Sequence, residues 1–457
     1  MINTESIDSF IKRNEDNIFR DIARLVAVNS VKSEPLPGAP FGIGPKAALD
    51  TALLIAGEMG LKTFNCDNKV GYAEISGDKE EYISTVTHVD CVDVNDGWTA
   101  DPFTMRERDG WIIGRGVQDD KGPSVICLYA LKYLQEAGVP LRYSVRAIMG
   151  ADEENGMGDI EYYLKNYPAP LFCFSPDADF PLVNGEKGIV RGSMTAKAAP
   201  VNIADIKGGF AVNVIPDKAE AWIKAENLQS ADKVTAVKEG ELWHLTATGI
   251  PGHASAPEGT DNAIGNLVDY ILDNNIVSGG EKEYFDFLRA FHSDAHGNGV
   301  GAYAKDDVFG EITIVGGIIG MKNGRIVSSF DSRYPTSTDA GKIAAALAEK
   351  AGEAAEIAIE ADSVPFYMSP DNPAVKCCIN TYNEVTGENA VPFTIGGGTY
   401  ARDFPNGVSF GPEHPERPMP DFAGPIHGVD EAACKDWLLE ALKIYIITLI
   451  KLQELDF

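Results

Sequence analysis

The feature that most constrains the fold is an alternation of short apolar runs with helical patterns in the first part of the chain. Runs typical of buried strands lie at residues 82–87, 143–149 and 171–175. The intervening segments 124–138 and 160–165 have the spacing of helices with one apolar face. Strands that alternate with helices favour a mostly parallel sheet with helices on its faces. The sequence therefore predicts an α/β fold.

The pattern changes after residue 188. Beyond it we expect strands at residues 189–197, 218–225, 242–248, 310–318 and 325–333, and helices at 261–275 and 338–353. This predicts an inserted domain, because the later helical patterns at 373–388 and 437–452 still need the first sheet to pack on. The predicted domains are a discontinuous one, formed by residues 1–188 and 363–457, and an insert of residues 189–362.

The charge and composition of the chain argue against several classes of partner. The formal net charge is −29 over 457 residues, which disfavours binding to nucleic acid and to anionic membranes. The most apolar segment, 437–452, is interrupted by charges and is too short to span a bilayer. The seven cysteines are scattered without Cys-x-x-Cys spacing, which is typical of a reducing compartment. Since the start of the chain lacks the pattern of an export signal, we expect a cytoplasmic protein.

His88 and Asp90 come directly after the predicted strand 82–87. Residues two apart on a strand face the same side, so Asp90 can accept the ring N–H of His88 and leave the other ring nitrogen for a metal. An isolated pair of this kind is more often a strand-terminal histidine beside a turn-forming aspartate. The acidic residues at the following strand ends favour the metal interpretation, because strand ends of an α/β sheet converge on one crevice.

Asp119 and Asp120 lie in a glycine-rich loop between a predicted strand at 111–113 and the predicted helix at 124–138. The role of a helix N-cap would explain one aspartate here but not two adjacent ones. One carboxylate can bridge two cations about 3.5–4 Å apart, which is the arrangement of two-metal hydrolases. Asp119 is therefore the candidate for such a bridge.

Glu153 and Glu154 follow the predicted strand 143–149, and Asp177 follows the strand 171–175. Two adjacent glutamates repel each other unless a cation compensates. One of them can then bind a metal while the other takes a proton from a water molecule, and the residues alone leave open which does which. A solvated acidic turn is the alternative for each position taken singly. Four consecutive strand ends with Asp, Glu or His exceed what turn preferences explain.

These motifs resemble the M20 metallopeptidase family in their order and spacing, and the resemblance covers almost the whole chain. The matching stretches are 87–90, 96–98, 114–122, 152–154, 175–177, 396–402 and 410–412, followed by His427 and Glu431. The long insert and the Gly-Gly-Gly-Thr-Tyr run look closest to the PepV-like dipeptidases. The resemblance implies a discontinuous zinc-peptidase catalytic domain, with a mixed, mostly parallel sheet flanked by helices, and an inserted α+β lid domain.

The resemblance also implies which residues bind metal. One zinc ion would be held by His88 and Asp177, and the other by Glu154 and His427. Asp119 would bridge the two, which gives two Zn²⁺ per subunit. Mn²⁺ or Co²⁺ could replace zinc, since histidine and carboxylate ligands accept all three metals.

Three further features follow from the same resemblance. Glu153 would be the catalytic base, and Asp90 would orient the metal-binding histidine. A cis peptide bond is expected between Asp119 and Asp120. The family commonly has a proline where this chain has Asp93; this departure leaves loop geometry and substrate preference open but removes no metal ligand.

In the insert, Asn213, His253 and Arg333 match residues that reach the substrate from the lid of family members. His253 and Asn213 could donate hydrogen bonds to the developing oxyanion, and Arg333 could hold the terminal carboxylate of the substrate. Gly397 and Arg402, in the glycine-rich motif, are also assigned to substrate binding. For each residue taken alone, a surface or turn position is the alternative.

Together these features predict a di-zinc dipeptidase that hydrolyses dipeptides with a free N-terminus by means of a metal-bridging water activated by Glu153. Its partners would be small peptides, and a monomer is favoured over a homodimer because the long insert can supply His253 in cis. The first alternative is an N-acyl-amino-acid deacylase of the same family. The second is a binding protein that holds metal without catalysis, against which the complete ligand set argues.

Overall fold

The computed structural model describes residues 2–457, so that Met1, the first residue of the predicted catalytic domain, lies outside the described part. The chain forms two compact units. Unit 1 comprises Met1–Gly185, Tyr367–Phe393 and Gly398–Phe457, and unit 2 comprises Glu186–Phe366 and Thr394–Gly397. Unit 2 thus includes a short segment that lies outside the predicted insert of residues 189–362.

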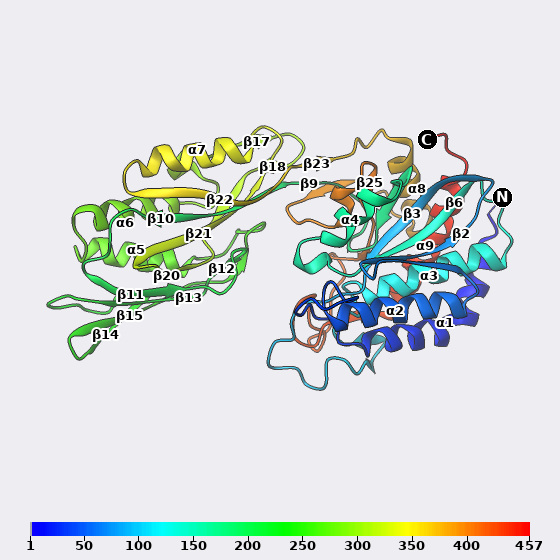
Figure 1. The fold of residues 1–457 in the computed structure, drawn as a ribbon, viewed down its shortest axis with the longest axis horizontal. Coiled ribbons are helices and arrows are strands. Elements are labelled where there is room, and N and C mark those ends of the chain that lie inside the picture. The colour runs from blue at the N-terminus through cyan, green and yellow to red at the C-terminus, as the bar shows by residue number, and fades with distance from the viewer. Residues whose placement is uncertain (1) are drawn as a thin grey trace. The chain divides into compact units, whose positions relative to one another are not determined.

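Unit 1 is built on a mixed sheet whose central strands are parallel (Figure 1). β3 (Lys79–His88) lies between β6 (Tyr143–Gly150) and β7 (Phe172–Ser175), and β25 (Gly407–Ser409) follows beside β7, all in parallel. Antiparallel pairs extend the sheet to β1 (Lys62–Cys66) and β2 (Val70–Ile75) on one side and to β9 (Val183–Glu186) on the other. The predicted mixed, mostly parallel sheet is confirmed.

Helices cover both faces of this sheet (Figure 1). The alternation of side chains along β2 separates the two faces. The Gly71 position lies against Leu49 and Leu53 of α2 (Ile43–Glu58), whereas the Tyr72 ring meets the Tyr163 ring of α4 (Gly158–Asn166) on the opposite face. The remaining helices of unit 1 are α1 (Thr4–Val26), α3 (Lys121–Glu136), α8 (Pro373–Thr386) and α9 (Lys435–Leu452). None of the helices within residues 2–457 is long and apolar enough to cross a bilayer.

The predicted strand at residues 111–113 does not belong to the main sheet. This strand, β5 (Trp111–Ile113), lies between β4 (Arg106–Arg108) and β27 (Ala432–Cys434) in a separate antiparallel sheet of three strands. Three of the four predicted strand ends therefore belong to the main sheet, whereas the strand before Asp119 belongs to another sheet, although Asp119 itself still lies beside His88. A run of three apolar residues carries no information about its partner, and β27 comes from the other end of the chain.

Unit 2 carries an antiparallel sheet in the order β14-β15-β13-β11-β20-β21-β10-β22, covered by three helices (Figure 1). The strands in chain order are β10 (Gly188–Ala196), β11 (Ile203–Gly208), β13 (Lys218–Ile223), β14 (Val234–Glu239), β15 (Leu242–Thr248), β20 (Ile319–Lys322), β21 (Arg325–Tyr334) and β22 (Ala355–Ser363). The helices are α5 (Ala263–Asp273), α6 (Gly279–Phe291) and α7 (Ala340–Ala351). This arrangement confirms the α+β class of the inserted domain.

Helix α6 was not predicted. It begins with Gly279 and Gly280, which are poor helix formers and conceal its start. The apolar pattern was nevertheless present, because Tyr284, Leu288 and Phe291 recur at helical spacing and are buried in the core of unit 2.

Candidate metal centre

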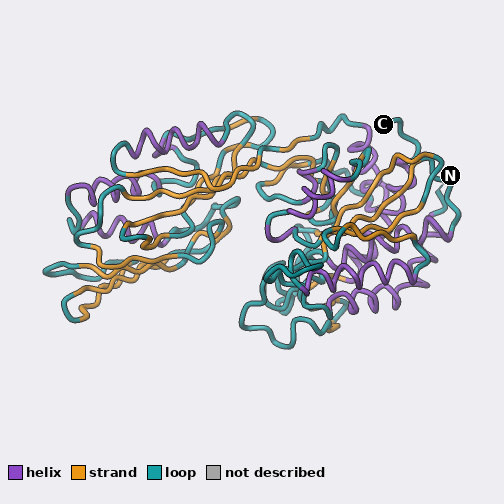
Figure 2. Tube along the Cα trace, in the orientation of Figure 1, coloured by secondary structure: helices purple, strands orange, loops and turns teal. Residues whose placement is uncertain are grey.

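The ends of three parallel strands bring predicted ligands together in unit 1. β3 ends at His88, the short 3-10 helix η1 (Glu153–Asn155) follows β6, and Asp177 follows β7. His88, Glu153 and Asp177 each place one ligand atom within 4.8 Å of the others. The carboxyl ends of adjacent parallel strands meet at one edge of a sheet, and in unit 1 this edge is occupied by loops (Figure 2).

Asp119 lies between the two histidines predicted to bind metal. Its Oδ1 is 2.8 Å from His88 Nε2, and its Oδ2 is 2.8 Å from His427 Nε2. His427 Nε2 also lies 3.2 Å from Glu154 Oε1. The two oxygens of one carboxylate thus face two different histidines, which is the geometry that a bridging ligand needs.

The donor atoms of this cluster fit cations. Three buried atoms make no well-aligned hydrogen bond within residues 2–457, although each lies within 3.2 Å of another predicted ligand: His88 Nε2, Asp119 Oδ1 and Glu154 Oε1. The three residues again place ligand atoms within 4.8 Å of one another. Carboxylates gathered away from water repel each other unless a cation compensates. Together with Asp177 and His427, these residues supply the mixture of nitrogen and oxygen ligands that two divalent metal ions accept.

The protonation of the cluster reflects this crowding. Burial raises the pKa of the Glu153 carboxyl well above its usual range, and the neighbouring Asp177 and Glu154 add to the effect. Burial opposes the charge on His427, but Asp119 and Glu154 raise its pKa to about 11. The chain alone therefore holds protons where metal ions would bind, and metal binding would release them.

Two buried aspartates hold the segment that carries both glutamates. Asp159 Oδ2 accepts hydrogen bonds from the first two amides of residues 151–154 at 2.6 and 2.8 Å. Asp90 accepts hydrogen bonds from the last two of these amides at 3.1 and 3.2 Å. Asp90 also lies 3.4 Å from His88 Nδ1. One aspartate therefore contacts both the histidine and the main chain of the glutamate pair.

Asp159 and Tyr400 were not identified as functional residues from the sequence. The Tyr400 hydroxyl donates to Asp159, and the Tyr400 ring meets the His88 ring edge-on with centroids 6.1 Å apart. Both residues are fully buried. Tyr400 lies in the glycine-rich motif, which offered a signal, whereas nothing in the local sequence distinguishes Asp159 from an ordinary acidic residue in the first turn of a helix.

Glu431 anchors the loop that carries Asp119. Its carboxylate accepts hydrogen bonds from three amides of residues 116–119, at 3.1–3.2 Å, and binds Arg115 Nη1 at 2.7 Å. Arg115 and Glu431 are both buried. Because Glu431 follows His427 by four residues, it ties the loop of His427 to the loop of Asp119.

The loop at Asp119 has the expected backbone. The peptide bond between Asp119 and Asp120 is cis, as predicted. Asp120 accepts the main-chain N–H of His88 at 3.1 Å. This contact gives the second aspartate of the pair a structural role at His88.

Asn213 and His253 lie together in unit 2. They are held by the short antiparallel pair of β12 (Val214–Ile215) and β16 (Gly252–His253), in which Val214 is opposite His253. Asn213 Nδ2 is 3.4 Å from His253 Nε2. The two predicted oxyanion donors are therefore neighbours.

Arg333, at the end of β21, is buried and forms hydrogen bonds with its neighbours. It binds the two carboxylate oxygens of Asp331 at 2.6 and 3.3 Å and donates to the Gly396 carbonyl at 2.8 Å. Gly397 follows in the same segment of unit 2, whereas Arg402 lies in the short helix η3 (Tyr400–Asp403) of unit 1.

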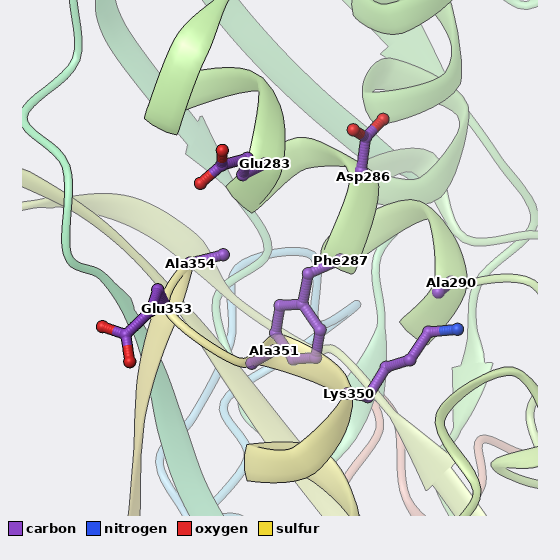
Figure 3. A pocket seen from close by; sticks show the side chains of 8 residues that line it. All are labelled: Glu283, Asp286, Phe287, Ala290, Lys350, Ala351, Glu353 and Ala354. Atoms are coloured by element: carbon purple, nitrogen blue, oxygen red, sulfur yellow. The ribbon is translucent and has the colours of Figure 1, made fainter.

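A surface pocket of unit 2 contains none of these residues. It is lined by α6 and by the end of α7, where Phe287 lies near Ala351 and Lys350 (Figure 3). The pocket is therefore not part of the candidate site.

Comparison with known proteins identifies the family. The model of Peptidase family M20/M25/M40 matches residues 85–451. The chain is 34% identical over 455 residues to a putative dipeptidase, YtjP, of Bacillus subtilis, covering 95% of this chain and 96% of that protein. It is 31% identical over 455 residues to a Beta-Ala-Xaa dipeptidase of Lactobacillus delbrueckii, covering 94% and 95%.

Solved structures share the fold at low sequence identity. Human carnosine dipeptidase 1 matches with a TM-score of 0.62 at 13% identity, covering 100% of both chains. A metallo-carboxypeptidase of Sulfolobus solfataricus matches with a TM-score of 0.59 at 16% identity, covering 96% of this chain and all of the other. A dinuclear metal-binding peptidase of Bacillus subtilis matches with a TM-score of 0.54 at 10% identity, covering 97% and 99%.

Proposed function

The chain belongs to peptidase family M20/M25/M40, and we propose that this metallo-dipeptidase uses two metal ions to hydrolyse dipeptides with a free N-terminus. The chain is similar over nearly its full length to proteins named dipeptidases, and this similarity supports the substrate class. The observation that carries the two-metal proposal is the carboxylate of Asp119, which faces His88 with one oxygen and His427 with the other. Two Zn²⁺ per subunit are proposed, and Mn²⁺ or Co²⁺ would suit the same ligands.

Each proposed metal ion has ligands from different segments of unit 1. His88 and Asp177 would hold one ion, Glu154 and His427 the other, and Asp119 would bridge them. When bound, the two ions would polarise the substrate carbonyl and make a water molecule more acidic.

In the proposed mechanism Glu153 moves the proton. Its carboxylate takes a proton from the attacking water and delivers it to the nitrogen of the leaving amine. The hydrogen bond from the Glu153 amide to Asp90, at 3.1 Å, holds this residue in one place along the main chain. Burial raises the pKa of the Glu153 carboxyl, and a carboxylate of higher pKa is a stronger acceptor of the proton from water.

Residues of unit 2 are proposed to bind the substrate. His253 and Asn213 would donate to the oxyanion that forms on the scissile carbonyl. Three of the five N–H groups of Arg333 bind Asp331 and Gly396, and in this proposal the other two hold the terminal carboxylate. Gly397 and Arg402 are proposed as further substrate contacts.

The proposed partners are small peptides, with no nucleic-acid or membrane partner. The proposed assembly is a monomer, because unit 2 of the same chain would supply His253, and a homodimer is the alternative. All seven cysteines are free, which supports the proposed cytoplasmic location.

The test is metal-dependent hydrolysis of a dipeptide panel by the wild type and by Glu153→Gln. We expect the substitution to lower kcat by about 10²–10⁴-fold without loss of bound metal, measured by elemental analysis. Glu136→Gln, on the surface of unit 1 with a 44% exposed side chain, is the matched control. Full activity of Glu153→Gln would refute the assigned base.

A second comparison separates the two reactions of the family. Ala-Ala and N-acetyl-Ala differ in whether the α-amine is free. We expect hydrolysis of Ala-Ala, and preference for the acetylated compound would establish the deacylase instead. Metal binding with turnover of neither compound would support a binding protein.

A further inference from the structure

The surroundings of His253 decide which of its ring nitrogens carries the proton. Nδ1 receives the main-chain N–H of Ser255 at 3.3 Å, and it lies 2.6 Å from the Ser255 hydroxyl. A main-chain N–H can only donate, so a proton on Nδ1 would face another proton. In the neutral ring the proton therefore belongs on Nε2, and the hydroxyl of Ser255 donates to Nδ1.

We propose that Ser255 is a positioning residue, which fixes His253 in the tautomer with its proton on Nε2 so that this nitrogen donates to the substrate oxyanion. The inference rests on the proposed function, in which His253 binds that oxyanion. The opposite tautomer would present a lone pair of Nε2 to the developing negative charge and would repel it. Ser255 would thus act on catalysis through the imidazole, without touching the substrate.

The side chain beside Nε2 is compatible with this tautomer. The amide group of Asn213 lies 3.4 Å from Nε2, and the oxygen and nitrogen of an amide are assigned from the hydrogen bonds that they make. With a proton on Nε2, Asn213 turns its oxygen toward the ring and accepts this N–H until the substrate oxyanion replaces it as the acceptor. Both N–H groups of the amide then remain available as donors, which suits a second oxyanion donor.

Ser255 is itself held tightly from two sides. Gly396 packs so closely that a Cβ at this position would come within 2.7 Å of Ser255 Cβ, and Arg333 fixes Gly396 through its carbonyl at 2.8 Å. On the other side, the amide of Ala254 donates to the Asn213 carbonyl at 2.9 Å. The hydroxyl is therefore placed by the packing of unit 2, and a larger side chain at position 396 would displace it.

The tautomer can be measured directly in the full chain by NMR of ¹⁵N-labelled histidine, because protonated and unprotonated ring nitrogens differ widely in shift. The seven histidines give few signals, and His253→Gln identifies the one of interest. At about pH 8, where an ordinary histidine is neutral, we expect the proton on Nε2 in the wild type and in Ser255→Thr. In Ser255→Ala the main-chain N–H still favours a proton on Nε2, but the shorter contact of the hydroxyl is lost, so we expect a second population with the proton on Nδ1.

The kinetic readout should follow the tautomer. Ser255→Ala should lower kcat by about tenfold, the equivalent of one hydrogen bond, with little change in KM, and Ser255→Thr should restore most of it. Ser293→Ala, which removes a hydroxyl at the end of α6, is the control and should behave as the wild type. A proton on Nδ1 in the wild type, or unchanged tautomers in Ser255→Ala, would overturn the inference.

His253→Ala separates this inference from the proposed function. If the wild type carries its proton on Nε2 but His253→Ala keeps full kcat, the oxyanion role fails while the tautomer assignment stands. If His253→Ala is inactive and the tautomer in Ser255→Ala is unchanged, the oxyanion role stands and the role of Ser255 fails.

Discussion

His427 directs its Nε2 at Asp119 Oδ2 across 2.8 Å, although its side chain is half exposed and its backbone has a φ of +59°. A non-glycine residue in this region carries strain that the surrounding structure must offset. Arg115, which binds Glu431, donates to the His427 carbonyl at 3.3 Å and holds this part of the backbone. The contact between His427 and Asp119 joins the C-terminal part of the chain to the loop before α3.

Replacing the bridge should remove both metal ions. Asp119→Asn keeps the shape of the side chain but has one acceptor oxygen in place of two, and it lacks the negative charge. We expect loss of both equivalents in equilibrium dialysis followed by elemental analysis, whereas His427→Ala should lose mainly one. Asp109→Asn, whose side chain is 79% exposed, should keep both. Retention of two ions by Asp119→Asn would show that Asp119 is not shared.

Breaking the buried pair of Glu431 and Arg115 should destabilise unit 1. Glu431→Gln leaves the Arg115 guanidinium buried without its partner and turns an NH₂ group toward amides that need an acceptor. The expected loss is about 3 kcal/mol in the free energy of unfolding, measured with denaturant. Glu107→Gln removes a partly exposed partner of Lys435 and should cost less than about 1 kcal/mol. Equal effects of the two variants would contradict the anchoring role.

Removing the Tyr400 hydroxyl should shift the fall of kcat/KM at acid pH to a higher pH. Burial raises the pKa of Asp159 to about 7, whereas the hydrogen bond from Tyr400 lowers this pKa. The ionised form of Asp159 accepts the amides that lead to Glu153, so this support is lost as pH falls through that pKa. In Tyr400→Phe the loss should begin at higher pH in the profile of kcat/KM. Tyr382→Phe, whose hydroxyl binds Glu388, should leave the profile unchanged.

His292 should make unit 2 sensitive to acid. Burial lowers the pKa of His292 to about 4, and its Nε2 finds no hydrogen-bond partner within residues 2–457. The unfolded chain binds this proton near pH 6.5, at the ordinary value of histidine, so stability is complete above that pH and falls toward pH 4. The slope is at most about 1.4 kcal/mol per pH unit.

His292→Leu should flatten that part of the stability curve. Thermal unfolding of the wild type and the variant, compared at about pH 8 and about pH 5, measures how much the protonation of His292 contributes to the loss of stability. The Tm of the variant should fall less than that of the wild type between these two pH values. An identical loss in both proteins would show that another group titrates.

The sequence by itself determined the features that depend on near neighbours. The buried runs before His88, Glu153 and Asp177 form strands of the sheet, and each is followed by acidic or histidine side chains within a few residues. Periodicity and strand-end chemistry are encoded over such short spans. The fold class and the family motifs could therefore be recognised before any coordinates.

Only the tertiary structure decided the relationships between distant segments. The partner of β5 is β27, which places Glu431 beside the loop of Asp119, and no local pattern specifies such a pairing. In the sequence, Asp159 is an ordinary acidic residue in the first turn of a helix. In the structure, its carboxylate accepts hydrogen bonds from the amides of residues 151 and 152. Segment 394–397 joins unit 2 through packing against Ser255. These contacts depend on long-range packing and hydrogen bonding. Buried polar groups need hydrogen-bond partners, and these partners come from segments that are distant in the sequence.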